Sequence, residues 1–165
     1  MKKRFMLFVV CLLLLTGCGK SGSVSKKNIP AEETAESTKI ALSDSGITVD
    51  GAAISDDETA AVYAAQDIVY YEEGQGVAYG AGTDADAHSQ EEADAHTVVH
   101  ITQPGTYTLS GTLSAGQIAV DLGDGAEEDP EAEVTIVLDG VDITCTVAPA
   151  IIFYRVYECG SADME

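Results

Sequence analysis

Hydrophobic and polar residues alternate along VTIVLDGVDIT, Val134 to Thr144, and the alternation changes phase at Gly140. The apolar positions of this stretch are Val134, Ile136, Leu138, Val141 and Ile143. A period of two residues is typical of a β-strand with one buried face. Because the buried face changes parity across a single glycine, we expect the strand to bend there, which glycine permits.

Strand-like patterns recur through the second half of the chain. The further segments are HTVVHIT, TYTLSGTL, QIAVDL and AIIFYRVYE. Short strands separated by turn residues at intervals of this kind are typical of a β-sandwich or of the rungs of a solenoid. The bend expected at Gly140 favours a solenoid, in which each strand turns a corner around one core. A sandwich containing a bulged strand stays open as the alternative within this all-β prediction.

Residues 40–95 have a mixed α/β pattern. Their first part, IALSDSGITVDGAAIS, predicts two short strands joined at glycines. The capping-box pattern at Ser55 to Glu58, followed by TAAVYAAQ, predicts a short helix, and DIVYY at Asp67 to Tyr71 predicts a strand. A second capping box, Ser89 with Glu92, predicts one or two further helical turns.

The N-terminal end predicts export and lipid anchoring. Residues 1–17 have a basic start followed by a short apolar run, which is typical of a signal peptide and too short for a membrane-spanning helix. The sequence LTGC that follows resembles the bacterial lipobox, so we expect Cys18 to be lipidated. Residues 18–39 are polar and predict a flexible linker. The expected location is extracytoplasmic, with the lipid holding the protein on the bacterial cell membrane; an ordinary signal peptide with a chance cysteine is the alternative.

The charge is strongly asymmetric: the formal net charge is −20, and residues 40–154 contain neither Lys nor Arg. Nucleic acid is therefore excluded as a direct partner, because binding it requires cations that neutralise phosphates. The acidic surface serves solubility or collects divalent cations. Of the cysteines that would remain after export, Cys145 and Cys159 either form a disulfide or stay as two free thiols.

The acidic loop DLGDGAEEDPEAE, Asp121 to Glu133, is the main candidate metal site. Its candidate ligands for calcium are Asp121, Asp124, Glu127, Glu128 and Asp129. Calcium takes six to eight such oxygens, but the loop lacks the glycine and glutamate positions of an EF-hand. A solvated loop without metal is the alternative. His96 and His100 fall on one side of a strand, and we expect surface histidines there, without zinc.

FYRVY, Phe153 to Tyr157, is the candidate carbohydrate-binding segment. If the strand buries its even-numbered residues, Phe153, Arg155 and Tyr157 share the outer face and place two rings beside a guanidinium. Arg could then hold a uronate carboxylate through two parallel hydrogen bonds. The opposite parity would bury the rings and leave Arg155 at the rim.

No catalytic motif stands out, so we expect no enzyme activity. Arg155 is the single basic residue of the β-region, whereas a lyase acting on uronates needs a base and a group that neutralises the carboxylate. A hydrolase needs two carboxylates at a defined separation, and the acidic pairs here are too many to choose among.

Several phrases of the chain carry a family resemblance. They are VYAAQDIVYY, the long run from DADAHSQEEADAH to VTIVLDGVDIT, and CTVAPAIIFYRVYECG. From about Ala61 to Gly160 the sequence resembles the carbohydrate-binding domain family of bacterial surface lipoproteins. The resemblance implies a right-handed parallel β-helix, calcium sites, and binding of cellulose or pectin-like polymers without catalysis. Since domains of that family are much longer, residues 96–165 are expected to be the first rungs of a truncated β-helix.

The sequence as a whole predicts a lipid-anchored surface protein that binds plant-type polysaccharide, with calcium bridging to acidic polymers. Two other functions stay open: a structural spacer or adhesin module, and a fragment of a polysaccharide lyase.

Overall fold

The β-strands of this protein form two mixed sheets, which we call sheet A and sheet B. The computed structural model describes residues 36–71 and 74–157, and these residues contain one short α-helix beside the strands. The prediction of a mostly β-fold is therefore confirmed. Within these residues no helix has the length and hydrophobicity required to cross a membrane. The expected signal peptide and Cys18 lie outside the described residues.

Sheet A contains five strands in the order β3-β2-β1-β6-β8. Its strands are β1 (Thr38–Leu42), β2 (Thr48–Val49), β3 (Ala52–Ala53), β6 (Gly105–Leu113) and β8 (Val134–Ile143). The first three pair as antiparallel neighbours, whereas β6 lies parallel to both β1 and β8. Sheet A therefore joins strands from the predicted linker, the mixed segment and the later β-region.

Sheet B contains four strands in the order β4-β5-β7-β9. Its strands are β4 (Val62–Ala65), β5 (Thr97–Ile101), β7 (Gly116–Asp121) and β9 (Ile151–Arg155). β4 is antiparallel to β5, and β5, β7 and β9 pair in parallel. The remaining elements are the 3₁₀ turns η1 (Asp84–Asp86) and η2 (Ala126–Glu128) and the helix α1 (Gln90–Asp94).

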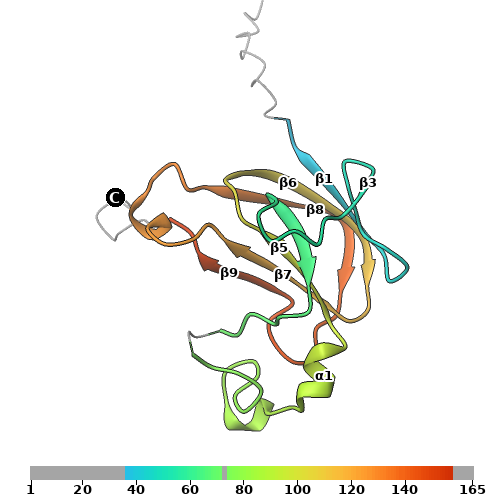
Figure 1. The fold of residues 1–165 in the computed structure, drawn as a ribbon, viewed down its shortest axis with the longest axis vertical. Coiled ribbons are helices and arrows are strands. Elements are labelled where there is room, and N and C mark those ends of the chain that lie inside the picture. Colours follow the sequence, from blue (N-terminus) through green and yellow to red (C-terminus); the bar gives the residue numbers. More distant parts are fainter. Residues whose placement is uncertain (1–35, 72–73, 158–165) are drawn as a thin grey trace, which may run out of the picture. The chain divides into compact units, whose positions relative to one another are not determined.

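From β5 onward the chain alternates between the sheets (Figure 1). β5, β7 and β9 belong to sheet B, and the intervening β6 and β8 belong to sheet A. Parallel neighbours need a long crossover, and here each crossover contains a strand of the opposite sheet. The pairs of this region are parallel in both sheets, so it is not built from the antiparallel layers of an ordinary sandwich.

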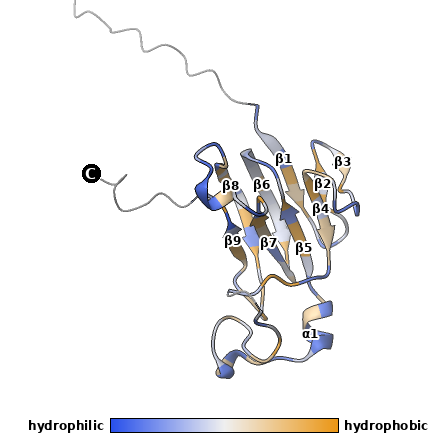
Figure 2. Cartoon of the chain, turned by 60° about the vertical axis from the view of Figure 1, so that its left-hand side comes forward, coloured by the Kyte–Doolittle hydropathy of each residue, from blue (hydrophilic) through white to orange (hydrophobic). Residues whose placement is uncertain are grey.

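The main hydrophobic core lies between the two sheets. Sheet A contributes Ile40, Leu109 and Leu113, and sheet B contributes Ile118 and Val120, all nearly inaccessible to solvent. Figure 2 shows hydrophobic segments along the strands of both sheets, whereas α1 is largely hydrophilic. Because both sheets supply side chains to the same core, neither sheet can form its buried face alone.

The change in hydrophobic alternation at Gly140 of β8 corresponds to a β-bulge. Leu109 of β6 faces Leu138, but the next paired residue, Gly111, faces Val141, so β8 has one extra residue at this point. Gly140 lies in the extra segment with φ of +65°, a left-handed conformation that glycine adopts at little cost. Figure 1 shows β6 and β8 changing direction along their length. The bend expected at Gly140 is therefore present, inside one continuous strand.

Leu138 departs from the expected pattern, since it is 56% exposed. Its partner Leu109 is completely buried. β8 is the edge strand of sheet A, so no other strand of the described residues covers Leu138 on its open side. The alternation correctly identified the strand but could not show that it lies at an edge.

The predictions for the N-terminal half are partly wrong. Instead of the helix expected after Ser55 to Glu58, residues 62–65 form β4. Asp57 accepts hydrogen bonds from the backbone and hydroxyl of Thr59, which stabilise a turn that competes with a helix. DIVYY, residues 67–71, does not form a regular strand. The helical turn expected at Ser89 is confirmed as α1, with Ser89 and Glu92 forming a capping box.

The two bend glycines give a matched pair of substitutions. In Gly111→Ala, the new Cβ would overlap the carbonyl oxygen of Leu42, at a residue whose φ is +90°. In Gly140→Ala the φ is also positive, but no atom lies within 4 Å of the new Cβ. Urea unfolding should show a loss of about 1 kcal/mol for Gly140→Ala and of at least about 3 kcal/mol for Gly111→Ala. Equal losses would contradict the close approach of β1 to β6.

Candidate functional site

The outer face of sheet B, opposite the main core, carries the candidate site, which we call the outer groove. It consists of two cavities that share Tyr154, with volumes of about 300 and 390 Å³. Its polar and aromatic lining is Tyr63, Asp67, Tyr70, Gln75, His100, Asp121, Asp124, Glu127, Tyr154 and Arg155. Cavities of this size, with rings and a few polar groups, are typical of small-molecule sites.

Tyr63 and His100 form one wall of the outer groove. They face each other across the β4–β5 pair, and their rings stack at 4.5 Å with an interplanar angle of 6°. His100 is 5% exposed, and its Nε2 donates to Asp67 Oδ1 at 2.9 Å. Desolvation, followed by the negative charge of Asp67, raises the pKa of Tyr63. The Tyr63 hydroxyl therefore stays protonated and can donate a hydrogen bond.

Arg155 and Asp121 form the opposite part of the groove. A bulge in β9 lets Arg155 pair with Asp121, while Val120 pairs with Phe153. Arg155 Nε donates to Asp121 Oδ1 and Nη2 donates to Oδ2, both at 2.7 Å. Nη1 donates to Asp124. The guanidinium is thus held by two carboxylates, one of them in the bidentate geometry that is strongest for Arg.

These contacts shift the pKa values of both Asp121 and Arg155. Partial burial alone would raise the pKa of Asp121, but the hydrogen bonds from Arg155 and from the Gly123 backbone lower it overall. The hydrogen bonds and charges of Asp121 and Asp124 outweigh desolvation and raise the pKa of Arg155. Both groups therefore remain ionised across the neutral range.

The structure separates the three residues predicted to contact sugar. Arg155 lies in the outer groove, but Phe153 and Tyr157 line another cavity, beside Ala132 to Thr135. Phe153 is 48% exposed although it pairs with the fully buried Val120, because β9 is the edge strand of sheet B. The predicted row of two rings beside a guanidinium is not formed.

The prediction of surface histidines is wrong, since His96 and His100 are both buried. His96 Nδ1 lies 2.7 Å from the carbonyl oxygen of Glu92, so this nitrogen carries the proton. Its Nε2 then accepts from the backbone N–H of Thr146 at 3.3 Å. Both histidines are buried because each has a hydrogen-bonding partner supplied by a distant segment, which a strand pattern does not reveal.

Gln117 fixes the segment that covers the outer face of sheet B. The side chain is fully buried. Its Oε1 accepts from the Val69 backbone N–H at 2.9 Å, and its Nε2 donates to the carbonyl oxygens of Val69 and Pro149 at 2.8 and 2.9 Å. One side chain thus supplies the partners that a neighbouring strand would otherwise give Val69, and it holds the wall of the groove between Asp67 and Tyr70.

The acidic loop does not assemble a calcium site in this arrangement. Asp121 and Asp124 bind Arg155, and Asp129 accepts from the backbone N–H of Glu131. Within residues 36–71 and 74–157, no group of three His, Cys, Asp or Glu side chains converges as metal ligands. Calcium binding by this loop therefore stays a prediction, and it would require the loop to rearrange.

Cys145 is free and half-buried in the described structure. Its expected partner Cys159 lies outside the described residues, so the disulfide also stays a prediction.

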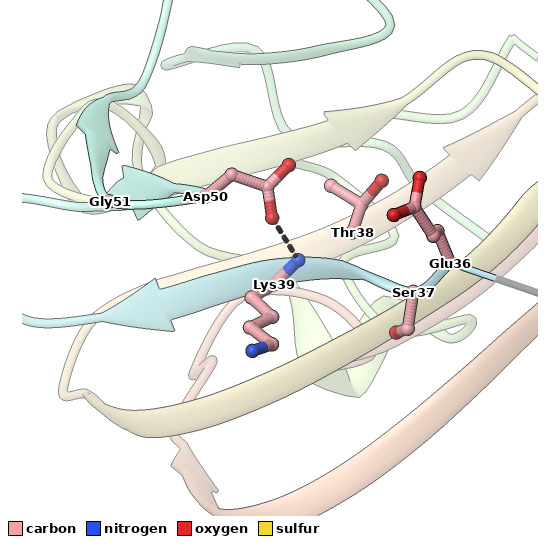
Figure 3. Close-up of a pocket in the computed structure, with 6 residues that line it drawn as sticks. All are labelled: Glu36, Ser37, Thr38, Lys39, Asp50 and Gly51. Atoms are coloured by element: carbon pink, nitrogen blue, oxygen red, sulfur yellow. Dashed lines mark hydrogen bonds between the residues drawn. The ribbon is translucent and has the colours of Figure 1, made fainter. Parts of the chain in front are cut away.

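A larger cavity, of about 690 Å³, lies beside the start of β1 (Figure 3). Its lining is Glu36, Ser37, Thr38, Lys39, Asp50 and Gly51, with no aromatic ring. Within it, Asp50 Oδ1 accepts from the Lys39 backbone N–H at 2.9 Å, and Asp50 N–H donates to the Lys39 carbonyl. These contacts complete a turn between strands, so the cavity is a weaker candidate than the outer groove.

One part of the chain is similar to known proteins. Residues 95–159 match a family described as carbohydrate-binding domain-containing protein. A protein of that same description from Acetivibrio thermocellus is 51% identical over 53 residues, which are 32% of this chain and 16% of the relative. No solved structure matches. The family segment contains β5 to β9, whereas Tyr63, Asp67 and Tyr70 precede it.

Replacing Gln117 by Met should remove the side-chain partner of three partly buried backbone groups, which are the Val69 N–H and the carbonyl groups of Val69 and Pro149. We expect Gln117→Met to lower the free energy of unfolding by about 3 kcal/mol, because each buried unpaired group costs about 1 to 3 kcal/mol. Hydrogen exchange should also show loss of protection at the Val69 amide. Gln90→Met on the exposed surface of α1 is the control and should change stability by less than about 0.5 kcal/mol. Retained protection at Val69 would contradict the anchoring role.

The Asp121–Arg155 pair predicts an acid-dependent loss of stability. The folded state lowers the pKa of Asp121, so it binds the proton more weakly than the unfolded chain does. The stabilisation is complete at pH values above 3.8, the ordinary pKa of the carboxyl group. It is lost as the pH falls through the lowered pKa of Asp121 in the folded state.

Urea unfolding of Asp121→Asn should therefore show a deficit of about 1 to 2 kcal/mol at neutral pH that disappears in strong acid. Asp142→Asn, at an exposed position of β8, should show no comparable deficit. A deficit for Asp121→Asn that stayed constant from neutral pH to strong acid would rule out the ion pair as its cause.

Proposed function

We propose that this protein binds polysaccharide through the outer groove, without cleaving it. The observation that carries the proposal is the gathering of Tyr63, Tyr70 and Tyr154 with hydrogen-bonding carboxylates on one face of sheet B. The match of residues 95–159 to carbohydrate-binding proteins supports it, because β5, β7 and β9 of this face all begin and end inside that segment.

The lining suits sugars in two ways. Aromatic rings offer apolar area that can cover the C–H faces of a sugar, and their hydroxyl groups can hydrogen-bond at the edge. Asp67 is 67% exposed and uses only Oδ1 to accept from His100, which leaves Oδ2 for a sugar hydroxyl. The hydrogen bond from buried His100 fixes the position of the Asp67 carboxylate. The acceptor oxygen is therefore already in place before a ligand binds.

The charge states in the groove favour binding over catalysis. A glycosidase needs one carboxylic acid with a raised pKa, whereas the pKa of Asp121 is lowered. A lyase needs a group that can accept a proton, whereas Arg155 is more firmly protonated than usual and is held by two carboxylates. Neither residue is suited to proton transfer.

We further propose that the alternating strands β5 to β9 are the opening rungs of a right-handed parallel β-helix. The return of the chain to the same sheet with every second strand, in parallel register, supports this architecture. Stacking further rungs would extend the face that carries the groove and would suit a long polymer better than a single sugar.

The remaining parts of the proposal rest on the sequence. LTGC at Cys18 and the polar linker after it support a lipid-anchored protein on the outer side of the bacterial cell membrane. Its ligands would be plant-type polymers, cellulose-like or pectin-like, with calcium as a candidate bridge to acidic chains. A structural spacer without glycan specificity is the competing function, and it requires no preserved groove.

Binding experiments with tyrosine variants test the proposal. Tyr63→Ala and Tyr154→Ala should each weaken retention on an immobilised polysaccharide panel at least about tenfold, a loss of about 1.4 kcal/mol. Circular dichroism should confirm that each variant stays folded. Tyr79→Ala, a 45% exposed tyrosine outside the groove, is the control and should bind normally.

Phe153→Ala tests whether the ligand binds in the outer groove or on the surface of Phe153 and Tyr157 that the sequence predicted. It should bind normally if the outer groove is the site. Loss of binding in Phe153→Ala with normal binding in Tyr63→Ala and Tyr154→Ala would move the site to the cavity beside Tyr157. Absence of binding to any polysaccharide would favour the structural spacer.

A further inference from the structure

We infer that the outer groove selects neutral sugar chains and rejects chains of uronic acids. This inference rests on the proposed function and adds the chemical class of the ligand. It follows from the distribution of charge in the groove, where carboxylates outnumber cations and the guanidinium is already bound.

The groove has more fixed negative charge than positive charge. Its acidic lining residues are Asp67, Asp121, Asp124 and Glu127. Arg155 is the sole Lys or Arg among the described lining residues. Lys39, the nearest basic residue before it in the sequence, lines the separate cavity at β1. A carboxylated sugar in the outer groove would therefore meet carboxylates without a free cation.

Arg155 could in principle offset this charge, but its side-on fork is occupied. Nε and Nη2 form this fork, which matches a carboxylate, and both donate to Asp121. The other amino group, Nη1, donates to Asp124. A uronate could gain this fork only by displacing Asp121, whose side chain is 22% exposed and would lose its partner in a poorly solvated position.

Neutral sugars avoid this conflict and use the same carboxylates. Each sugar hydroxyl can donate to a carboxylate oxygen, as a charge-assisted hydrogen bond. Asp67 Oδ2 is available for such a bond, and Tyr63 and Tyr154 supply rings beside it. The acidic lining therefore attracts hydroxyl donors while it repels carboxylates, so one set of residues gives both affinity and selectivity.

The decisive comparison uses one polymer in two charge states. The full chain is first screened by affinity electrophoresis, in EDTA, against neutral glucans, mannans and galactans whose C6 hydroxyl groups are free, and against polygalacturonate. The neutral polymer that binds is then oxidised at C6, which converts its hydroxymethyl groups to carboxylates without changing the backbone. Dissociation constants are measured for both forms at about 10 mM and about 1 M salt.

We expect the oxidised polymer to bind at least about tenfold more weakly at low salt. The difference should shrink at high salt, because the screening length falls from about 30 Å to about 3 Å. Binding of the neutral polymer should change little with salt. Equal or tighter binding of the oxidised polymer in EDTA would overturn the inference.

Charge variants locate the repulsion. Asp124→Asn removes one carboxylate and weakens the hold on Nη1 of Arg155, so it should improve binding of the oxidised polymer about threefold at about 0.1 M salt, where screening acts over about 10 Å. Glu128→Gln removes the same charge from the same loop but does not line the groove, and it should have little effect. Equal improvement in both variants would assign the selectivity to net charge and overturn the local explanation.

The possible failures are distinguishable. Retention by polygalacturonate in EDTA, without retention by any neutral polymer, would overturn the inference and leave polysaccharide binding intact. No retention by any polymer would refute the proposed function itself. Retention by polygalacturonate only when calcium is added would support the inference, because the groove would then need an added cation to accept an acidic chain.

Discussion

The structure depends on one shared hydrophobic core between two sheets that the chain enters alternately. Leu109 and Ile118 show the constraint: they are fully buried, belong to opposite sheets and are separated by a single turn of the chain. Each time the chain passes from one sheet to the other, the next strand must place its apolar side chains toward this core. The bulge at Gly140 and the positive φ of Gly111 let β8 and β6 bend without rotating these faces outward.

The same alternation creates the candidate site. When Val99 and Ile118 point into the core, their neighbours His100 and Ala119 must point to the outer face of sheet B. That face is covered only in part, by the segment that Gln117 holds at Val69. The uncovered remainder is the groove. The position of the site is therefore a consequence of how the core is packed.

Local patterns predicted the strands well because a buried face imposes a period of two, as in TYTLSGTL and QIAVDL. They predicted the site poorly because its contacts join distant positions: His100 binds Asp67, and Gln117 binds Val69, across 33 and 48 residues. Alanine-rich TAAVYAAQ favoured a helix, but pairing with β5 outweighed this weak propensity. For Arg155, the prediction from sequence assumed strict alternation along the strand. The bulge in β9 breaks this alternation, so Arg155 and Phe153 do not share a face as expected.

Residues 40–165 contain a single Lys or Arg, which is Arg155, and the fold uses it internally. Pairing Arg155 with Asp121 stabilises the end of β9 against β7, but it also removes the one cation that could have received an acidic ligand. A free guanidinium in the groove would bind uronates and leave Asp121 partly buried without compensation. Stability of the last strand and the proposed recognition of neutral sugars thus follow from the same ion pair, which would make such selectivity difficult to reverse without weakening the sheet.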